Sequence, residues 1–283
     1  MLAPVLKATQ KALHPMQEFR STFLKRKLRA FEPKVVFRTE YKDYEIKTAE
    51  TFEELQSVLR LRYEVFVKEG LKKRKLSGVD FDRYDLMGDH VLIRRKDDKR
   101  ALGTYRLLSS EFTDEFYSQS EFDMSDFINS PGNKLELGRA CIHKDFRSGS
   151  AISIVWKGLG KYAQLTKADY FFGCSSVKTT DAKESMAIFQ ELKTEHFDGQ
   201  FEVRPLPEFQ FDSYPSFVEP EIQKIAVDKI PTLLKSYLKA GSKIAGLPAY
   251  DRDFQCIDFL TILNLSKVDP RYRERYFQHD DSI

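Results

Sequence analysis

The sequence of 283 residues has no long apolar run: no stretch of about 18 or more apolar residues occurs in it. A membrane-spanning helix needs about 20 such residues, so none is expected. The first residues also lack the apolar stretch of roughly 7–15 residues that marks a secretory signal. Both absences predict a cytoplasmic protein.

Cysteine is scarce, with three residues, Cys141, Cys174 and Cys256, and no CxxC pair. This usage argues against a zinc site and against a disulfide framework, so we expect no metal and a reducing compartment. Cys174 ends the apolar run Phe171–Cys174. We therefore interpret Cys174 as a core residue rather than a nucleophile.

The net charge is only +3, but it is unevenly placed. Residues 1–40 hold nine Lys or Arg against three Glu, a balance of +6, and the remainder carries −3. Apolar side chains recur at helical spacing between residues 16 and 31, with basic ones among them. Such a helix either lies on an anionic membrane surface or packs on the body with a solvated basic face. Nucleic acid is not expected as a partner, because aromatic stacking platforms are not evident.

The remaining residues, 41–283, read as a single domain with an extension at 219–283. Hydrophobic periodicity and turn residues predict an alternation of strands and helices. The expected strands are 41–49, 90–95, 101–108, 135–142, 170–174, 201–203 and 256–265. The expected helices are 51–70, 152–165, 181–192 and 230–238, with a Gly/Pro-containing turn after the last. A hairpin that feeds a strand–helix–strand unit indicates an α/β fold with a mixed, mostly antiparallel central sheet flanked by helices.

Two arginines interrupt apolar stripes. Arg62 follows Leu59 on the face of the helix after Thr51, and Arg106 shares one face of the strand 101–108 with apolar neighbours. A charged group in an apolar stripe is unfavourable unless it snorkels to water or meets an anion. We predict that both arginines line a cleft rather than snorkel.

The loop that follows the first helix carries three carboxylates in six residues, Asp80, Asp82 and Asp85. They could form a site for a cation or an amine. The spacing by itself favours a solvated loop.

The strand 135–142 contains Glu136 and Arg139 among apolar residues. A regular strand would place these two side chains on opposite faces. Gly138 between them permits a bulge, and bulges often re-aim side chains beside active sites. A buried ion pair is the alternative interpretation.

Together these segments resemble the acyl-carrier-protein-dependent branch of the GNAT superfamily. That branch includes the ornithine N-acyltransferases of ornithine-lipid synthesis, N-acyl amino acid synthases and, more distantly, acyl-homoserine-lactone synthases. The resemblance covers about residues 42–277. It rests on Leu61–Phe66, the acidic loop, Gly103–Leu108, Glu136–Arg139, Phe171–Ser175 and Gly246–Phe254.

The resemblance implies a GNAT-type fold, with Glu136 as the general base of an N-acyltransferase. It also implies that six residues shape the substrate cleft: Arg62, Phe66, Asp82, Asp85, Arg106 and Arg139. An amine is mostly protonated at neutral pH, and a partly desolvated carboxylate can accept its proton. The amine can then attack a thioester without a covalent enzyme intermediate.

The stretch Arg147–Ala151 is one residue shorter than the loop with which coenzyme A-dependent GNAT enzymes cradle pyrophosphate at a helix N-terminus. This departure favours the phosphopantetheine arm of an acyl carrier protein as donor, with no cofactor of the enzyme's own. The expected reaction moves a 3-hydroxyacyl group to the α-amine of ornithine and yields a lyso-ornithine lipid. The expected partners are the carrier protein, the amino acid and an anionic membrane surface, with a peripheral position on the inner membrane face.

Two alternatives stay open. The acceptor could be another amino acid, such as glycine or tyrosine. The chain could also be a non-catalytic membrane- or carrier-binding protein on a GNAT scaffold.

Overall fold

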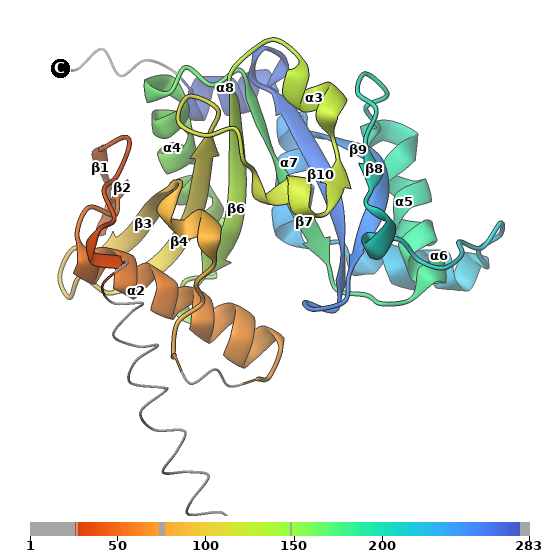
Figure 1. Ribbon diagram of the computed structural model, residues 1–283, viewed down its shortest axis with the longest axis horizontal. Coiled ribbons are helices and arrows are strands. Elements are labelled where there is room, and N and C mark those ends of the chain that lie inside the picture. The colour runs from red at the N-terminus through yellow and green to blue at the C-terminus, as the bar shows by residue number, and fades with distance from the viewer. Residues whose placement is uncertain (1–25, 27, 74–76, 148, 278–283) are drawn as a thin grey trace, which may run out of the picture. The chain divides into compact units, whose positions relative to one another are not determined.

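The computed structural model describes residues 26, 28–73, 77–147 and 149–277 (Figure 1). The chain forms two compact units, one of Met1–Tyr105 with Arg139–Arg147, the other of Arg106–Gly138 with Ser148–Ile283. Most of the expected basic helix near residues 16–32 lies outside the described residues. Among those described, no helix has both the length and the apolar character to cross a membrane.

The first unit is built on antiparallel strand pairs. Its strands are β1 (Arg38–Tyr41), β2 (Tyr44–Thr48), β3 (Asp89–Arg95) and the first part of β4 (Ala101–Ser109), in that spatial order. Its helical segments are α2 (Phe52–Arg62), the π-helical η1 (Tyr63–Gly70) and the 3₁₀ turns η2 (Arg83–Leu86) and η4 (Lys144–Phe146). The predicted hairpin at residues 96–99 is present, since the Arg95 amide donates to the Arg100 carbonyl.

Helix α2 begins where the sequence predicts. The Thr51 side chain accepts a hydrogen bond from the Glu54 amide at 3.2 Å, and the Glu54 carboxylate accepts from the Glu50 amide at 2.8 Å. Leu55 and Leu59 on its apolar face are fully buried and pack with Val79 of the following loop. The helix then widens into η1 and ends at Gly70, as expected.

The second unit has strands in the spatial order β6-β7-β10-β9. They are β6 (Lys134–Ile142, shared with the first unit), β7 (Tyr170–Val177), β10 (Cys256–Asn264) and β9 (Lys243–Asp251), with β5 (Phe122–Asp123) and β8 (Arg204–Pro205) as a separate short pair. The helices are α3 (Ser125–Asn129), α4 (Gly149–Leu165), α5 (Ala182–His196), α6 (Pro220–Asp228), α7 (Thr232–Ala240) and α8 (Pro270–Tyr276). The 3₁₀ turns are η3 (Tyr117–Ser120), η5 (Pro207–Phe209) and η6 (Leu265–Lys267).

Strands β6 and β7 run parallel, paired over Lys134–Glu136 and Tyr170–Phe172, whereas β7–β10 and β10–β9 are antiparallel. The prediction of a mixed, mostly antiparallel α/β architecture with flanking helices is therefore confirmed.

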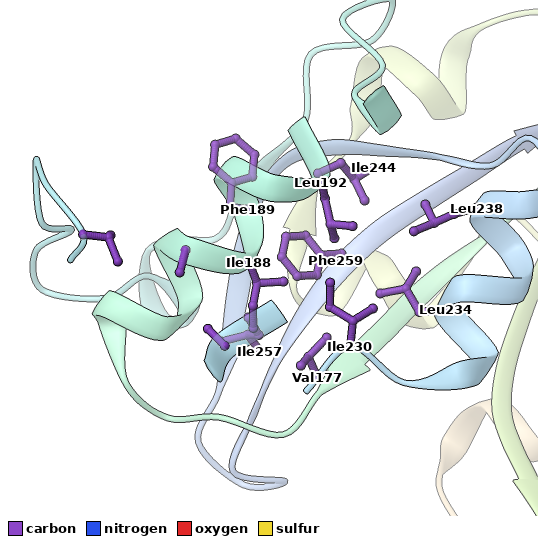
Figure 2. Packing of buried hydrophobic residues seen from close by; sticks show 13 residues of the cluster. Val177, Ile188, Phe189, Leu192, Ile230, Leu234, Leu238, Ile244, Ile257 and Phe259 are labelled. Carbon is purple, nitrogen blue, oxygen red and sulfur yellow. The ribbon is translucent and has the colours of Figure 1, made fainter. Parts of the chain in front are cut away.

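The core of the second unit lies on one face of β7, β10 and β9. Ile257 and Phe259 of β10 point into a cluster with residues of α5 and α7, which Figure 2 shows around Phe259. Since successive strand residues alternate between faces, Cys256 and Asp258 of β10 face the other way. The buried apolar residues Leu260 and Ile262 lie on that same face of β10, so the face carries both polar and apolar side chains.

Residues 243–251 form a strand, which corrects the expectation of a simple Gly/Pro turn there. The strand accommodates Gly246 and Pro248 because its pairing with β10 shifts register between Ala249 and Ala245. Gly246 lies in this bulge with a φ of +75°, and a Cβ there would lie 2.2 Å from the Val203 carbonyl oxygen. Only glycine satisfies both conditions, so a turn signal in the sequence marks a bulge instead.

Candidate active site

Glu136 is buried on β6, with 2% of its surface exposed. One carboxylate oxygen accepts a hydrogen bond from the Tyr117 amide at 2.8 Å. The other accepts from the Ser118 amide at 2.7 Å and from the Ser118 hydroxyl at 2.5 Å. The first residues of η3 therefore hold the carboxylate in a fixed orientation.

Burial raises the pKa of the Glu136 carboxyl above its usual value, although the Ser118 hydrogen bonds and the nearby Arg106 charge work in the opposite direction. A carboxylate with a raised pKa holds a transferred proton more readily than one in water. This direction of shift is compatible with a general base, and the role of Glu136 stays a prediction.

Arg106 also lies near Glu136. It is 1% exposed, and its guanidinium carbon lies 5.5 Å from the centre of the Tyr117 ring, in cation–π geometry. Tyr117 in turn donates its amide to Glu136. Arg106 therefore does not snorkel to solvent, and it belongs to the surroundings of Glu136. Its contact with a substrate stays a prediction.

A second buried carboxyl, Glu121, is joined to Glu136 through two side chains. The Cys174 thiol lies 3.4 Å from the Ser118 hydroxyl oxygen and 3.6 Å from a Glu121 carboxylate oxygen. Burial and the charges of Asp258 and Asp251 raise the pKa of Glu121 to about 9. Glu121 is therefore a neutral acid at neutral pH.

Burial and the Glu121 charge also raise the pKa of the Cys174 thiol well above its usual value. A protonated thiol is a poor nucleophile. This agrees with the interpretation that Cys174 does not form a covalent intermediate.

Three further polar side chains lie near Glu121, where β9 ends and β10 begins: Asp251, Cys256 and Asp258. Asp251 of β9 is paired directly with Cys256 of β10. Asp258 accepts a hydrogen bond from the Ser176 hydroxyl at 2.5 Å, and the Cys256 thiol lies 3.5 Å from its other oxygen. Burial and the Asp258 charge raise the pKa of Cys256, so its sulfur stays protonated. Their ligand atoms lie within 4.8 Å of one another, so these three side chains could bind a cation.

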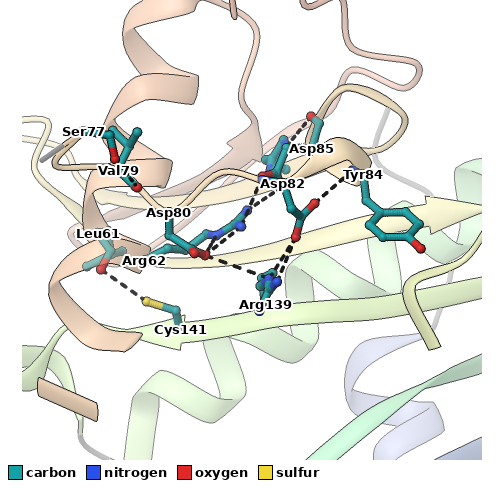
Figure 3. Close-up of polar contacts among 11 residues, drawn as sticks. Leu61, Arg62, Ser77, Val79, Asp80, Asp82, Tyr84, Asp85, Arg139 and Cys141 are labelled. Carbon is teal, nitrogen blue, oxygen red and sulfur yellow. Dashed lines mark hydrogen bonds and ion pairs between the residues drawn. The ribbon is translucent and has the colours of Figure 1, made fainter. Parts of the chain in front are cut away.

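The first unit contains a separate network around Arg62 (Figure 3). Arg62 is fully buried. Its Nε and Nη2 donate to one oxygen of Asp80 at 3.0 and 2.8 Å, and its Nη1 donates to Asp85 at 2.5 Å. Burial alone would lower the pKa of the Arg62 guanidinium, but the carboxylates of Asp85 and Asp80 raise it. Arg62 therefore meets anions in the interior and does not snorkel.

This network overturns the interpretation of the acidic segment as a solvated loop. Asp80 is 4% exposed and Asp85 is fully buried. Asp85 also accepts the Asp82 amide at 2.8 Å, and Asp82 accepts the Tyr84 amide at 2.9 Å, which closes a capping box on η2. The spacing suggested a solvated loop because the partner, Arg62, lies 18 and 23 residues away in the sequence.

Arg139 joins the same network through Asp82, with its Nη2 2.8 Å from an Asp82 oxygen. The backbone irregularity expected at Gly138 falls instead at Arg139, which has a φ of +51°. A left-handed conformation costs a non-glycine residue about 1–2 kcal/mol. The ion pair with Asp82 helps to hold the guanidinium where this backbone directs it.

Phe66 lies on η1 and is half-buried. Arg147 donates to Glu69 at 2.6 Å and to the Ile142 carbonyl at 3.1 Å. Ser148 lies outside the described residues, so the pyrophosphate argument for the stretch 147–151 stays a prediction. So do the contacts of Phe66, Arg62, Asp82, Asp85 and Arg139 with a substrate.

Comparison with known proteins agrees with this description. Residues 61–157 match the family described as acetyltransferase (GNAT) domain. These residues therefore carry a GNAT-type acyltransferase domain, as the sequence predicts.

The names of the chain's curated relatives describe the reaction in more detail than the family description does. The chain is 29% identical to the L-ornithine N(alpha)-acyltransferase of Rhodobacter capsulatus, over 82% of this chain and 94% of that protein. It is 28% identical to the L-ornithine N(alpha)-acyltransferase of Agrobacterium fabrum, over 82% of this chain and 84% of that protein. The resemblance inferred from the motifs is confirmed. Among solved structures, the coenzyme A-dependent acyl-homoserine lactone synthase BjaI aligns at a TM-score of 0.46 with 13% identity, covering 78% of this chain and 80% of that one.

The residues that surround Glu136 could not be predicted from the sequence. Tyr117 and Ser118 lie in a polar stretch without periodicity, and Glu121 follows them there. One signal was available: Asp258 interrupts the apolar strand 256–265 as Arg106 interrupts its own strand.

Proposed function

We propose that this protein transfers a 3-hydroxyacyl group from acyl carrier protein to the α-amine of ornithine, which yields a lyso-ornithine lipid. The single observation that supports this most is the similarity to curated ornithine acyltransferases over 82% of the chain. The buried carboxylate of Glu136, with its raised pKa, supplies the chemistry that such a reaction needs.

In the proposed reaction Glu136 accepts a proton from the α-ammonium group. The freed amine attacks the thioester carbonyl, and the tetrahedral intermediate collapses to the amide. The carrier thiolate leaves and takes up a proton, so the net change is thioester plus ammonium to amide, thiol and one proton. Hydrogen bonds from Tyr117 and Ser118 keep the Glu136 carboxylate oriented for this step.

A carrier-protein donor and a peripheral position at the membrane are parts of the same proposal. The shortened stretch 147–151 supports a donor with a single phosphate rather than the pyrophosphate of coenzyme A. The amide product would carry a fatty chain and partition into lipid, which favours synthesis at a membrane surface.

The test uses the purified full-length protein with the same 3-hydroxyacyl chain on carrier protein and on coenzyme A. A panel of ornithine, glycine and tyrosine serves as acceptor, and products are identified by mass spectrometry. We expect N-acyl ornithine, and a higher kcat/KM with the carrier protein. Parity between donors would refute the donor assignment, a different main product would reassign the acceptor, and no turnover with any combination would support the non-catalytic alternative.

A further inference from the structure

More buried carboxyl groups lie near Glu136 than one proton transfer requires. Glu121, Asp251 and Asp258 are 1%, 5% and 3% exposed. Desolvating a carboxylate is unfavourable unless a counter-charge or a proton compensates it. Three of them on the sheet face opposite the helical core therefore call for a functional explanation.

A series of direct side-chain contacts connects Glu136 to Glu121. The path runs from Glu136 to the Ser118 hydroxyl, then to the Cys174 thiol and to Glu121. Asp258 lies on the far side of Glu121, close enough for its charge to raise the pKa of Glu121. Glu121 and Asp258 therefore belong to the immediate surroundings of Glu136, with the Ser118 and Cys174 side chains between them.

The names of the curated relatives indicate which second group their substrate carries. The curated relatives act on L-ornithine, which carries an α-amine and, four carbon atoms away, a second amine. The α-amine is the nucleophile of the proposed reaction. The other amine is a cation at neutral pH that takes no part in it, and a buried ammonium needs an anionic partner.

Resting on the proposed function, we propose that Glu121 and Asp258 bind the side-chain ammonium of a diamino acid and so select it over amino acids with an apolar side chain. Asp251 is a supporting carboxylate, since its Oδ1 accepts the Asp253 and Phe254 amides at 2.8 and 2.9 Å and closes the β9–β10 turn. The raised pKa of Glu121 fits this assignment, because the acid keeps a proton until another cation replaces it.

Binding then exchanges one positive charge for another. The protonated Glu121 carboxyl gives its proton to solvent as the ammonium arrives, and a carboxylate–ammonium pair is formed. The titratable groups around Glu121 are Tyr117 of η3, Cys174 of β7, Asp251 of β9, and Cys256 and Asp258 of β10. Ornithine binding is therefore expected to release a proton and to strengthen as pH rises toward about 9.

The test compares ornithine with norvaline, which has the same carbon chain and α-amine but no second amine. Wild-type protein, Glu121→Gln, Asp258→Asn and the exposed control Glu208→Gln are assayed with both acceptors, after circular dichroism has confirmed their folds. A site built for a polar group rejects an analogue without it by a large factor, so we expect the wild type to prefer ornithine by about 100-fold or more in kcat/KM. In Glu121→Gln and Asp258→Asn this preference should shrink by at least about tenfold, while the control keeps it.

Calorimetry with ornithine and norvaline in the absence of donor, in two buffers of different ionisation enthalpy, measures affinity and proton release. Ornithine binding with proton release that both variants lose supports the inference even if another amine proves to be the acylated one. An equal loss for ornithine and norvaline, or no change in the ratio, overturns it. Failure of the proposed function is read separately, from the mass of the acylated product.

Discussion

At the scale of single residues, the role of Glu136 can be tested with a variant of nearly the same shape. Glu136→Gln removes the proton acceptor and keeps one oxygen for the Ser118 donors, but its amide nitrogen cannot accept the Tyr117 hydrogen bond, so circular dichroism first checks the fold. Loss of a general base typically lowers the rate by about 10²–10⁴-fold, and we expect a fall of that size in kcat. Partial recovery at high pH, where more amine arrives deprotonated, would support the role. A folded variant as active as the exposed control Glu111→Gln would refute it.

Glu121 makes a second prediction, about stability. An unfolded glutamate loses its proton near pH 4.5, whereas folded Glu121 keeps it up to about 9. Between these values unfolding releases a proton, so rising pH favours the unfolded state. The stability contributed by Glu121 is complete below about 4.5 and is lost as pH rises through about 9.

The variant Glu121→Gln cannot titrate at this position. Urea unfolding at pH 5, 7 and 9 should therefore show a free energy of unfolding that falls more steeply with pH in wild type than in the variant. Parallel profiles would mean that Glu121 is ionised in the folded protein at neutral pH.

At the scale of elements, the packing of α8 on α4 depends on one glycine. A Cβ at Gly160 would lie 2.0 Å from the Tyr276 carbonyl oxygen, closer than any real contact. In a free helix, Gly→Ala stabilises by about 1 kcal/mol. Here we expect the opposite sign, because α8 must move away. Gly199→Ala, whose nearest atom would be 3.6 Å away, is the control, and thermal unfolding is the measurement. An unchanged or raised Tm for Gly160→Ala would contradict the packing.

The 3₁₀ turn η2 depends on the ion network around Arg62. Asp85→Asn removes one of the two carboxylate partners of the buried Arg62 and weakens the cap of η2. Such changes typically destabilise by about 3–5 kcal/mol. The exposed pair Lys68–Glu64 offers a matched control, since breaking a surface pair costs about 1 kcal/mol or less. Equal effects of Asp85→Asn and Glu64→Gln on urea unfolding would show that the network is not a stability element.

The elements also show how far sequence reasoning reaches. Local signals were sufficient for the Thr51 cap and for the hairpin before Arg100, because their determinants lie within a few residues of each other. The anomalies at Arg62, Arg106 and Glu136 were also visible, since a charge in an apolar stripe is recognised locally. Their partners were not: Ser118 donates to Glu136 from 18 residues away, and that pairing depends on tertiary structure.

At the scale of the whole molecule, the basic residues near the N-terminus predict binding to anionic vesicles. Leu28 and Phe31 are 2% and 8% exposed and belong to the core of the first unit, so a deletion must stop before them. A variant without residues 1–25 should co-sediment less with anionic vesicles than the full chain. Added salt should weaken the binding of the full chain, because salt screens the attraction. Equal sedimentation of both proteins would refute the prediction that residues 1–25 contribute to vesicle binding.

The division into units has a consequence for biosynthesis. Each unit takes its residues from two separate stretches, and the boundary passes through β4 and β6. During translation the first unit remains incomplete until Arg147 has left the ribosome. Residues 106–138, with Glu136 among them, emerge before the stretch that completes their own unit. A nascent chain therefore carries Glu136 for some time without the strands that bury it, and this interval is when a chaperone would be most useful.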